Sequence, residues 1–334
     1  VARGLIALNA AMSACEKGGE WERTLALLEE LQRGRFAPNV VTYGAAVSAC
    51  EKGAVWQRAL ALLAEMDRAS LESNVITCSA GISACEKGRR WRPALRLLER
   101  MLSGSLEVNV ITYSAVISAC EKGLEWQRAL GCLQGMLEEE VEPDVVVYGA
   151  ALSACEKGKQ WVRALCLLAE LRGASLELNV VACSAAVSAL EKGGRWEHAL
   201  ELLREMREGG VVADAIIFNA AISACEKGCA PACALALLRV MRQGRLKPTA
   251  VSYNAAISAC EKGKWWDEPV QLLAEMQQYG PAPDDITFNA VLSVCAHRAQ
   301  WARSLELLEE MRQRRLAPDA AARSAAVAAC GGAG

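Results

Sequence analysis

Short hydrogen-bonding side chains recur every 35 residues along this 334-residue sequence. The first series holds only Asn, Ser and Gly: Asn9, Gly44, Ser79, Ser114, Gly149, Ser184, Asn219, Asn254 and Asn289. The second series, 30 residues further along in each case, holds Asn, Asp or Thr: Asn39, Asn74, Asn109, Asp144, Asn179, Asp214, Thr249, Asp284 and Asp319. These groups supply hydrogen-bond donors and acceptors, so the two series could contact a ligand that is itself repetitive.

Two further series accompany the polar pairs. Three residues before each member of the first series stands a β-branched aliphatic residue, whose side chain could flank a flat base: Ile6, Val41, Ile76, Ile111, Val146, Val181, Ile216, Val251 and Ile286. Eight residues after the first eight members stands a lysine that follows a glutamate: Lys17, Lys52, Lys87, Lys122, Lys157, Lys192, Lys227 and Lys262.

A 35-residue repeat carries all four series. We place the repeats at residues 5–39, 40–74, 75–109, 110–144, 145–179, 180–214, 215–249, 250–284 and 285–319, with a partial tenth repeat at 320–334. No linker or low-complexity tract interrupts them, so we expect a single domain over residues 1–334. Counted from the start of a repeat, the four series occupy its second, fifth, thirteenth and last places.

Each repeat predicts two helices, as residues 40–74 illustrate. The segment "VVTYGAAVSACEK" places Val40, Tyr43, Val47 and Cys50 on one helical stripe, and Gly53 then suits a left-handed C-terminal cap. The segment "WQRALALLAEM" places its Trp, the following Ala and Leu, a second Leu and the Met on one face. A hairpin of this kind cannot bury its apolar stripe alone, so the fold class expected is all-α, an α-solenoid of about nine stacked hairpins.

Two prolines and the last repeat depart from this pattern. Pro231 replaces the Trp at the start of a second helix, where proline is tolerated. Pro269 lies deeper in the next second helix and is expected to disturb it locally. The ninth repeat reads "CAHRAQW" and lacks the Gly, so we expect a looser C-terminal end.

The polar series fall on the face of the first helix opposite the apolar stripe. The second, fifth, ninth, twelfth and thirteenth places share a stripe about 100° wide, opposite the cysteine of the repeat. Helix capping could explain the Asn, Asp and Thr residues of the last place. It does not explain the fifth place, which lies inside the helix, where Gly and Asn reduce helix propensity. This restriction indicates a ligand.

Composition narrows the classes of function. Hydrophobic residues make up 53% of the chain, but no apolar run reaches the length of a membrane span. The net charge of −2 counts against nucleic-acid binding unless positive charge gathers on one face. The chain begins with Val inside a repeat, so we expect a fragment whose targeting segment lies upstream.

Cysteines recur at one place of the repeat, where Leu190 substitutes once. That substitution indicates buried free thiols that pack as small hydrophobes in a reducing compartment, rather than disulfides. The residues are Cys15, Cys50, Cys85, Cys120, Cys155, Cys225, Cys260, Cys295 and Cys330.

The sequence resembles the pentatricopeptide repeat family in its 35-residue period, in "VVTYGAAVSACEKG" and "ALALLAEM", and in the terminal "PD" or "PN". The resemblance implies a right-handed superhelix that binds single-stranded RNA, one nucleotide per repeat. It further implies that the fifth and last residues choose the base, that the second residue sandwiches it, and that the lysine approaches phosphates. Family members act in RNA processing, stabilisation or translation in the mitochondrion or chloroplast, so the resemblance implies an organellar location.

The resemblance also implies bases. Asn9 with Asn39 implies a pyrimidine, C preferred, and Ser79 with Asn109 implies A. Ser114 with Asp144 and Ser184 with Asp214 imply G. Asn254 with Asp284 and Asn289 with Asp319 imply U, and Asn219 with Thr249 a weaker pyrimidine. The repeats of Gly44 and Gly149 depart from the usual pairs and stay unassigned. The implied site is 5′-Y-n-A-G-n-G-Y-U-U-3′.

Two alternatives stay open. A protein- or peptide-binding scaffold is the usual task of helical-repeat proteins, and the near-neutral charge favours it. An enzyme needs a site: His198 and His297 begin no zinc-deaminase motif, and no phosphate-binding glycine loop occurs. We therefore predict a binding protein rather than an enzyme, with no cofactor, no metal and no membrane. Protein partners or a catalytic module could lie outside this segment.

One cysteine cluster has a spacing that could suggest a metal site. Cys225, Cys229 and Cys233 have helical spacing, but Gly and Pro residues between them break a shared helix. We expect no metal there.

Overall fold

The computed structural model describes residues 2–34, 37–104, 106–244, 246–297 and 301–317, together with residues 320, 323 and 324. These residues form eighteen α-helices in two compact units, Val1–Gly158 and Lys159–Gly334. The first unit contains α1 (Ala2–Gly18), α2 (Trp21–Arg33), α3 (Val40–Lys52), α4 (Trp56–Arg68), α5 (Val75–Lys87), α6 (Trp91–Ser103), α7 (Val110–Lys122), α8 (Trp126–Glu138) and α9 (Val145–Lys157). The second contains α10 (Trp161–Gly173), α11 (Val180–Lys192), α12 (Trp196–Glu208), α13 (Ala215–Lys227), α14 (Pro231–Gln243), α15 (Ala250–Lys262), α16 (Glu268–Tyr279), α17 (Asp285–His297) and α18 (Trp301–Gln313).

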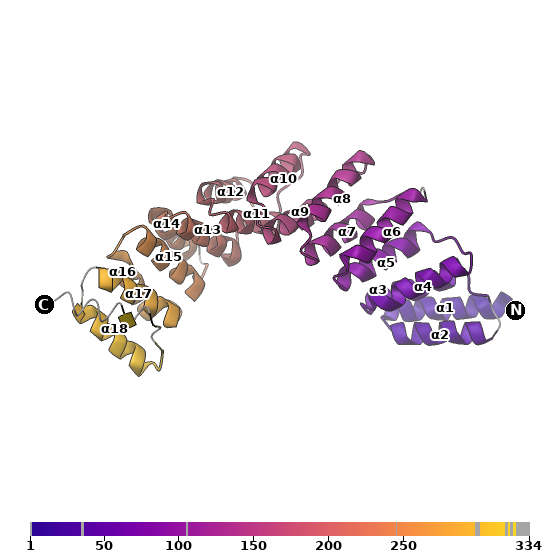
Figure 1. The fold of residues 1–334 in the computed structure, drawn as a ribbon, viewed down its shortest axis with the longest axis horizontal. Coiled ribbons are helices and arrows are strands. Elements are labelled where there is room, and N and C mark those ends of the chain that lie inside the picture. The colour runs from indigo at the N-terminus through magenta and orange to yellow at the C-terminus, as the bar shows by residue number, and fades with distance from the viewer. Residues whose placement is uncertain are drawn as a thin grey trace. The chain divides into compact units, whose positions relative to one another are not determined.

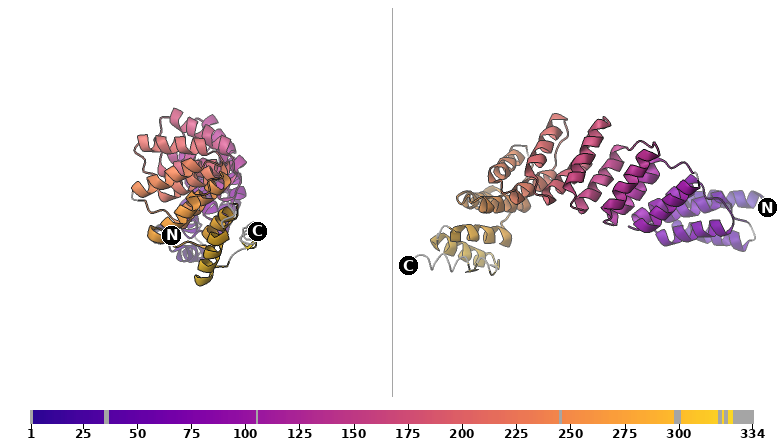
Figure 2. Two further views of the ribbon diagram at one scale, coloured as in Figure 1. Left: turned by 90° about the vertical axis from the view of Figure 1, so that its left-hand side faces the viewer. Right: turned by 45° about the horizontal axis from the view of Figure 1, so that its top comes forward.

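Within each unit the helices pair as hairpins that follow one another in chain order (Figures 1 and 2). First helices pack on first helices: α3 contacts α5, and α5 contacts α7. Within a unit, second helices pack on the first helices on either side of them, as α4 does on α3 and α5 and as α12 does on α11 and α13. This is the stacking of an α-solenoid, and the all-α fold class expected from the sequence is confirmed.

The last residue of a repeat caps the first helix that follows it. The Asn39 side-chain oxygen accepts a hydrogen bond from the backbone N–H of Thr42 at 3.0 Å. The equivalent bond, at 2.7–3.4 Å, forms at seven other last places: Asn74, Asn109, Asp144, Asn179, Asp214, Thr249 and Asp284. Capping is therefore one reason for the restricted residue types at the last place.

The glycine after each first helix has a different role from the one expected. Gly53 has a φ of −76°, and the left-handed conformation falls on Ala54, with a φ of 56°. The prediction of a left-handed glycine cap is therefore wrong. Glycine is needed because a Cβ on Gly53 would lie 2.4 Å from Cδ1 of Trp21, which packs there from the preceding hairpin.

The same Trp–Gly contact joins successive hairpins within both units. A Cβ would lie 2.0–2.5 Å from the Trp ring at Gly88, Gly123, Gly158, Gly193 and Gly228. At Gly263 the neighbour is Cγ of Pro231, also at 2.5 Å, so the proline occupies the place that Trp fills elsewhere. Stacking therefore requires glycine at these positions, since any side chain there would force the hairpins apart.

The core lies between the two rows of helices. In α3 the buried residues include Tyr43, Ala46 and Val47, and in α4 they include Leu62 and Leu63. Val40, Trp56 and Leu60, which are expected on the buried stripes, are only half-buried. Leu62 is buried as well, because α4 packs against both α3 and α5.

The repeated cysteines are buried free thiols, as predicted, at seven of their nine places: Cys50, Cys85, Cys120, Cys155, Cys225, Cys260 and Cys295. Burial raises the pKa of Cys50 to about 11 and that of Cys85 to about 12. Cys15 is half-buried, in α1, and Cys330 lies outside the described residues.

Pro269 moves a helix start, which confirms the expected local disturbance. The helix α16 begins at Glu268, two residues later than the other second helices, so that Pro269 falls in its first turn. The expectation of a looser C-terminal end concerns residues 298–300 and the segment after 317, most of which lie outside the described residues.

Candidate functional site

The nine aliphatic residues at the second place form an exposed series. These residues are 59–70% exposed, from Ile6 to Ile286, although the opposite side of the same helices is buried from α3 onward. Repeated exposure of β-branched side chains is costly in water and typical of a contact surface. We refer to the second, fifth, ninth, twelfth and thirteenth places of the first helices as the exposed stripe.

The fifth-place side chains lie beside these aliphatic residues and are half-buried, apart from Gly149, which is buried. At three of the Asn residues, a hydroxyl of the following hairpin donates to the side-chain oxygen. Thr42 Oγ1 donates to Asn9 Oδ1 at 2.8 Å, Ser252 Oγ to Asn219 Oδ1 at 2.5 Å, and Thr287 Oγ1 to Asn254 Oδ1 at 2.6 Å.

These hydroxyls are not among the site residues predicted from the sequence. They stand at the third place of a repeat and are almost fully buried, with 0–1% exposure, at Thr42, Thr77, Thr112, Ser252 and Thr287. The sequence did hold a signal, since Val147, Ala182 and Ile217 fill the same place elsewhere. A place that alternates between hydroxyl and apolar residues indicates a specific polar contact in some repeats only.

Fifth and last places also meet directly. The amide Nδ2 of Asn254 donates to both carboxylate oxygens of Asp284, at 3.1 and 3.2 Å, and Asn219 Nδ2 donates to Thr249 Oγ1 at 3.4 Å. Burial alone would raise the pKa of Asp284, but hydrogen bonds from Thr287 and Asn254 outweigh it and hold the pKa below its usual value of 3.8. Asp284 is therefore a carboxylate at neutral pH. Asp319, the last predicted base-reading residue, lies outside the described residues.

A last-place Asn or Asp caps the helix with one polar atom of its side chain, and the second polar atom takes no part in the cap. Oδ1 of Asn or Asp accepts from the helix N-terminus, as at Asn109 and Asp144. The remaining atom is a donor in Asn and an acceptor in Asp. Exchanging Asn for Asp therefore keeps the helix cap and reverses the hydrogen-bonding character of the other atom.

The lysines of the stripe form a ladder of ion pairs between hairpins. Lys52 Nζ lies 3.0 Å from Oε1 of Glu16, and the same pairing recurs, at 2.5–3.0 Å, at Lys87, Lys122, Lys157, Lys227 and Lys262. The lysine side chains are still 34–44% exposed. Within the described part, Lys17 has no ion-pair partner.

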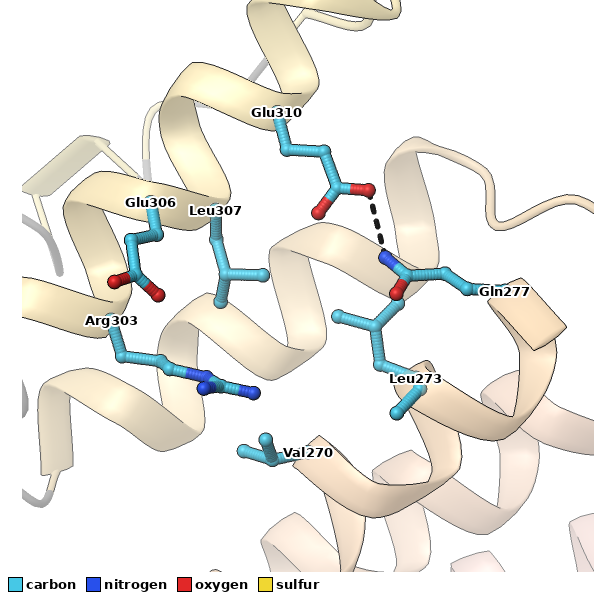
Figure 3. Close-up of a pocket in the computed structure, with 8 residues that line it drawn as sticks. Val270, Leu273, Gln277, Arg303, Glu306, Leu307 and Glu310 are labelled. Carbon is cyan, nitrogen blue, oxygen red and sulfur yellow. Dashed lines mark hydrogen bonds between the residues drawn. The ribbon is translucent and has the colours of Figure 1, made fainter.

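Two pockets among the described residues lie away from the stripe. One, of about 150 Å³, lies between α16 and α18, where Val270, Leu273 and Leu307 line it and Gln277 donates to Glu310 at 2.7 Å (Figure 3). Another is lined by Leu102, Leu106, Glu107, Val108, Glu139 and Val141. Neither contains a residue of the predicted site.

Other predicted features can be placed as well. Cys225 is buried and Cys229 exposed, and among the described residues no three His, Cys, Asp or Glu side chains gather as metal ligands. No described helix is long and apolar enough to cross a membrane.

Stacked hairpins with a restricted, exposed face on their first helices define a helical-repeat protein. Family models narrow this class. The PPR repeat family matches residues 248–297, the pentatricopeptide repeat domain matches 61–122 and 96–158, and the PPR repeat matches 181–211 and 286–316. Together they cover more than half of the chain, which therefore belongs to the pentatricopeptide repeat family.

Solved structures share the fold. The pentatricopeptide repeat protein PPR10 from maize matches with a TM-score of 0.64 and 20% identity, over 97% of this chain and 46% of that one. PPR10 in complex with an 18-nt psaJ RNA element matches with a TM-score of 0.53 and 21% identity, over 96% of this chain and 52% of that one. The chain thus spans about half the length of PPR10. A comparison with curated proteins gives no match.

Proposed function

We propose that this chain binds single-stranded RNA through the exposed stripe, with one nucleotide at each hairpin and no catalytic step of its own. The observation that carries the proposal is the series of second-place aliphatic residues, 59–70% exposed, each beside a hydrogen-bonding fifth place. A flat, unpaired base can lie against such an aliphatic surface while its edge meets the polar side chains. The fold is shared with PPR10, which has been solved with RNA, and this supports the same class of ligand.

The last-place residue would select the base through the side-chain oxygen or nitrogen that does not cap the helix. The oxygen of Asp144 or Asp284 that does not cap the helix accepts from the ring N–H of guanine or uracil. The free Nδ2 of Asn39 or Asn109 donates to the ring nitrogen of cytosine or adenine. This hydrogen-bond logic supports the bases that the family resemblance implies.

The fifth-place residue would select by size. Asn254 and Asp284 both belong to the uracil assignment, whereas Ser114 and Asp144 belong to guanine. The amide fills space that the serine hydroxyl leaves empty, so Asn favours a pyrimidine and Ser leaves room for a purine. Gly44 and Gly149 supply no side chain, and we assign no base to their hairpins.

The lysines would hold the phosphates, although each paired lysine already neutralises a glutamate. The Lys52 amine has three donors, and Glu16 takes part of them, so a phosphate would share the amine. The protein would then act in RNA processing, stabilisation or translation in a chloroplast or mitochondrion, with any catalytic module supplied outside this segment.

Selection from a random single-stranded RNA pool tests the proposal. The 334-residue chain should enrich 5′-Y-n-A-G-n-G-Y-U-U-3′, and duplex RNA, whose bases are already paired, should not compete. A matched control carries Ser at the exposed aliphatic residues Val41, Ile76 and Ile111, which should weaken binding without unfolding the chain. Enrichment of no RNA sequence would contradict the proposal and favour the protein-binding scaffold, to which the paired, neutral Glu–Lys ladder is also suited.

A further inference from the structure

We propose that the third residue of each hairpin is a positioning residue for the base contact of the hairpin before it. A Ser or Thr hydroxyl at this place locks the fifth-place amide in one orientation, and an apolar residue leaves the fifth place free to rotate. The inference rests on the proposed function, which it deepens by adding a residue that determines specificity.

The hairpin of Asn254 shows the lock most completely. The Thr287 hydroxyl lies 2.6 Å from Asn254 Oδ1 and 2.7 Å from Asp284 Oδ1, and it accepts the backbone N–H of Asp284 at 3.3 Å. Thr287 is fully buried. The hydroxyl therefore joins the fifth place, the last place and the next helix in one fixed cluster.

The lock has a consequence for recognition. With Oδ1 held by a hydroxyl, the amide turns Nδ2 toward the last-place residue, as Asn219 and Asn254 do. An amide fixed in this way presents a donor and not an acceptor to a ligand. A donor at that place matches the carbonyl oxygens of a pyrimidine. The hydroxyl therefore makes Asn offer only its N–H group to the base.

The distribution of residues supports the same conclusion. Among the hairpins whose following third place is described, Asn occurs at the fifth place only before Thr42, Ser252 and Thr287. Ser occurs at the fifth place before the apolar Val147 and Ile217, and also before Thr112, whose hydroxyl lies 2.7 Å from that of Ser79.

Helix capping accounts for only part of the role of the hydroxyl. The hydroxyl accepts the backbone N–H of the last-place residue in capping boxes at Asn39, Asn74 and Thr249. Val147, Ala182 and Ile217 nevertheless donate the cap bond from their own backbone N–H, at 2.7–2.9 Å, without a hydroxyl. Since the helix also starts with an apolar residue there, the contact of the hydroxyl with the fifth-place amide is an additional role.

The test uses Thr287→Val, which keeps the shape of the side chain, with Thr287→Ser as the conservative control. RNAs that carry U or G only opposite the Asn254 hairpin report discrimination, and thermal unfolding reports stability. Thr287→Val should lower the preference for U by about three- to tenfold, the range of one neutral hydrogen bond. Preferences at other hairpins should not change, and Thr287→Ser should restore the parent value.

A gain-of-function pair keeps the inference falsifiable if Thr287→Val unfolds. Ser114→Asn alone places an amide before Val147, and Ser114→Asn with Val147→Thr adds the hydroxyl. The double variant should prefer U over G about three- to tenfold more strongly than the single one. Two results would overturn the inference. One is that the U-over-G preference stays the same between the parent and Thr287→Val and between the single and double Ser114 variants. The other is that Thr287→Val lowers the base preference equally at all hairpins. If the parent chain binds no RNA, the proposed function itself fails, which is a separate result.

Discussion

The two faces of the first helix in each hairpin are equally repetitive in sequence and opposite in environment. In α7, Ile117 is fully buried and Ile111 is 69% exposed. The buried face carries the Ala, Val, Ile and Cys residues that stack hairpins, and the exposed face carries the second, fifth and thirteenth places. Repetition by itself therefore does not separate residues that hold the fold from residues that meet a ligand. Burial separates them.

Ile117→Ala and Ile111→Ala test this comparison with the same chemical change on one helix. Ile117→Ala should lower the free energy of unfolding by about 2–5 kcal/mol, because it leaves a cavity. Ile111→Ala should change it by less than about 0.5 kcal/mol and weaken RNA binding instead. Chemical denaturation and RNA titration of both variants give the two readouts. Equal loss of stability in both variants would contradict the division between the faces.

Gly88→Ala tests the packing between hairpins, with Gly131→Ala as its control. The new Cβ of Gly88→Ala would lie 2.3 Å from Cδ1 of Trp56, so the variant should lose about 1–3 kcal/mol of stability. Gly131 lies inside α8 with nothing within 4 Å of a Cβ, so Gly131→Ala should gain about 0.5–1 kcal/mol from helix propensity. Thermal unfolding that moves both variants in the same direction would show that the Trp contact does not decide this glycine.

Asn254→Ser tests the exposed face. It converts the pair with Asp284 to that of Ser114 with Asp144, so the preferred base at this hairpin alone should change from U to G. A base-edge contact is worth about 1–3 kcal/mol, or roughly five- to 150-fold in relative affinity. Competition between RNAs that differ in one nucleotide measures the change. Gln271→Ala, on the exposed side of α16 in the same hairpin, is the control and should leave the preference intact. An unchanged preference in Asn254→Ser would mean that the fifth place does not read bases.

Glu121→Gln tests the ion-pair ladder and should have the smallest effect. It frees Lys157, which lies 2.5 Å from the glutamate, and exposed ion pairs contribute less than about 1 kcal/mol to stability. A freed lysine should make the dependence of log K on log salt steeper by up to about 0.7. Glu72→Gln, in the exposed loop before α5, is the control for the loss of one negative charge. No difference in slope between the two variants would argue that Lys157 does not contact phosphate.

Much of the local structure could be predicted because its causes lie within one repeat. The segment "VVTYGAAVSACEK" is α3, Val40–Lys52, and the cap at Asn39 stands directly before it. The spacing of the apolar residues set the phase of the helix, which placed Cys50 inside and Val41 outside. Helix ends and faces follow from neighbours three or four residues away, and a sequence displays those directly.

The contacts that organise the site could not be predicted in the same way, because they join residues of neighbouring hairpins that lie 32 to 36 positions apart in the sequence. Adjacent Glu51 and Lys52 suggest a pair, yet Lys52 bonds to Glu16 and Glu51 to Lys87. The role of Gly53 depends on Trp21, and the orientation of Asn254 depends on Thr287. By itself the sequence determined the helices, their faces and the polar series on the exposed one. Only the tertiary structure decided which side chains meet, because stacking sets the offset between neighbouring hairpins and hydrogen bonds form only at that offset.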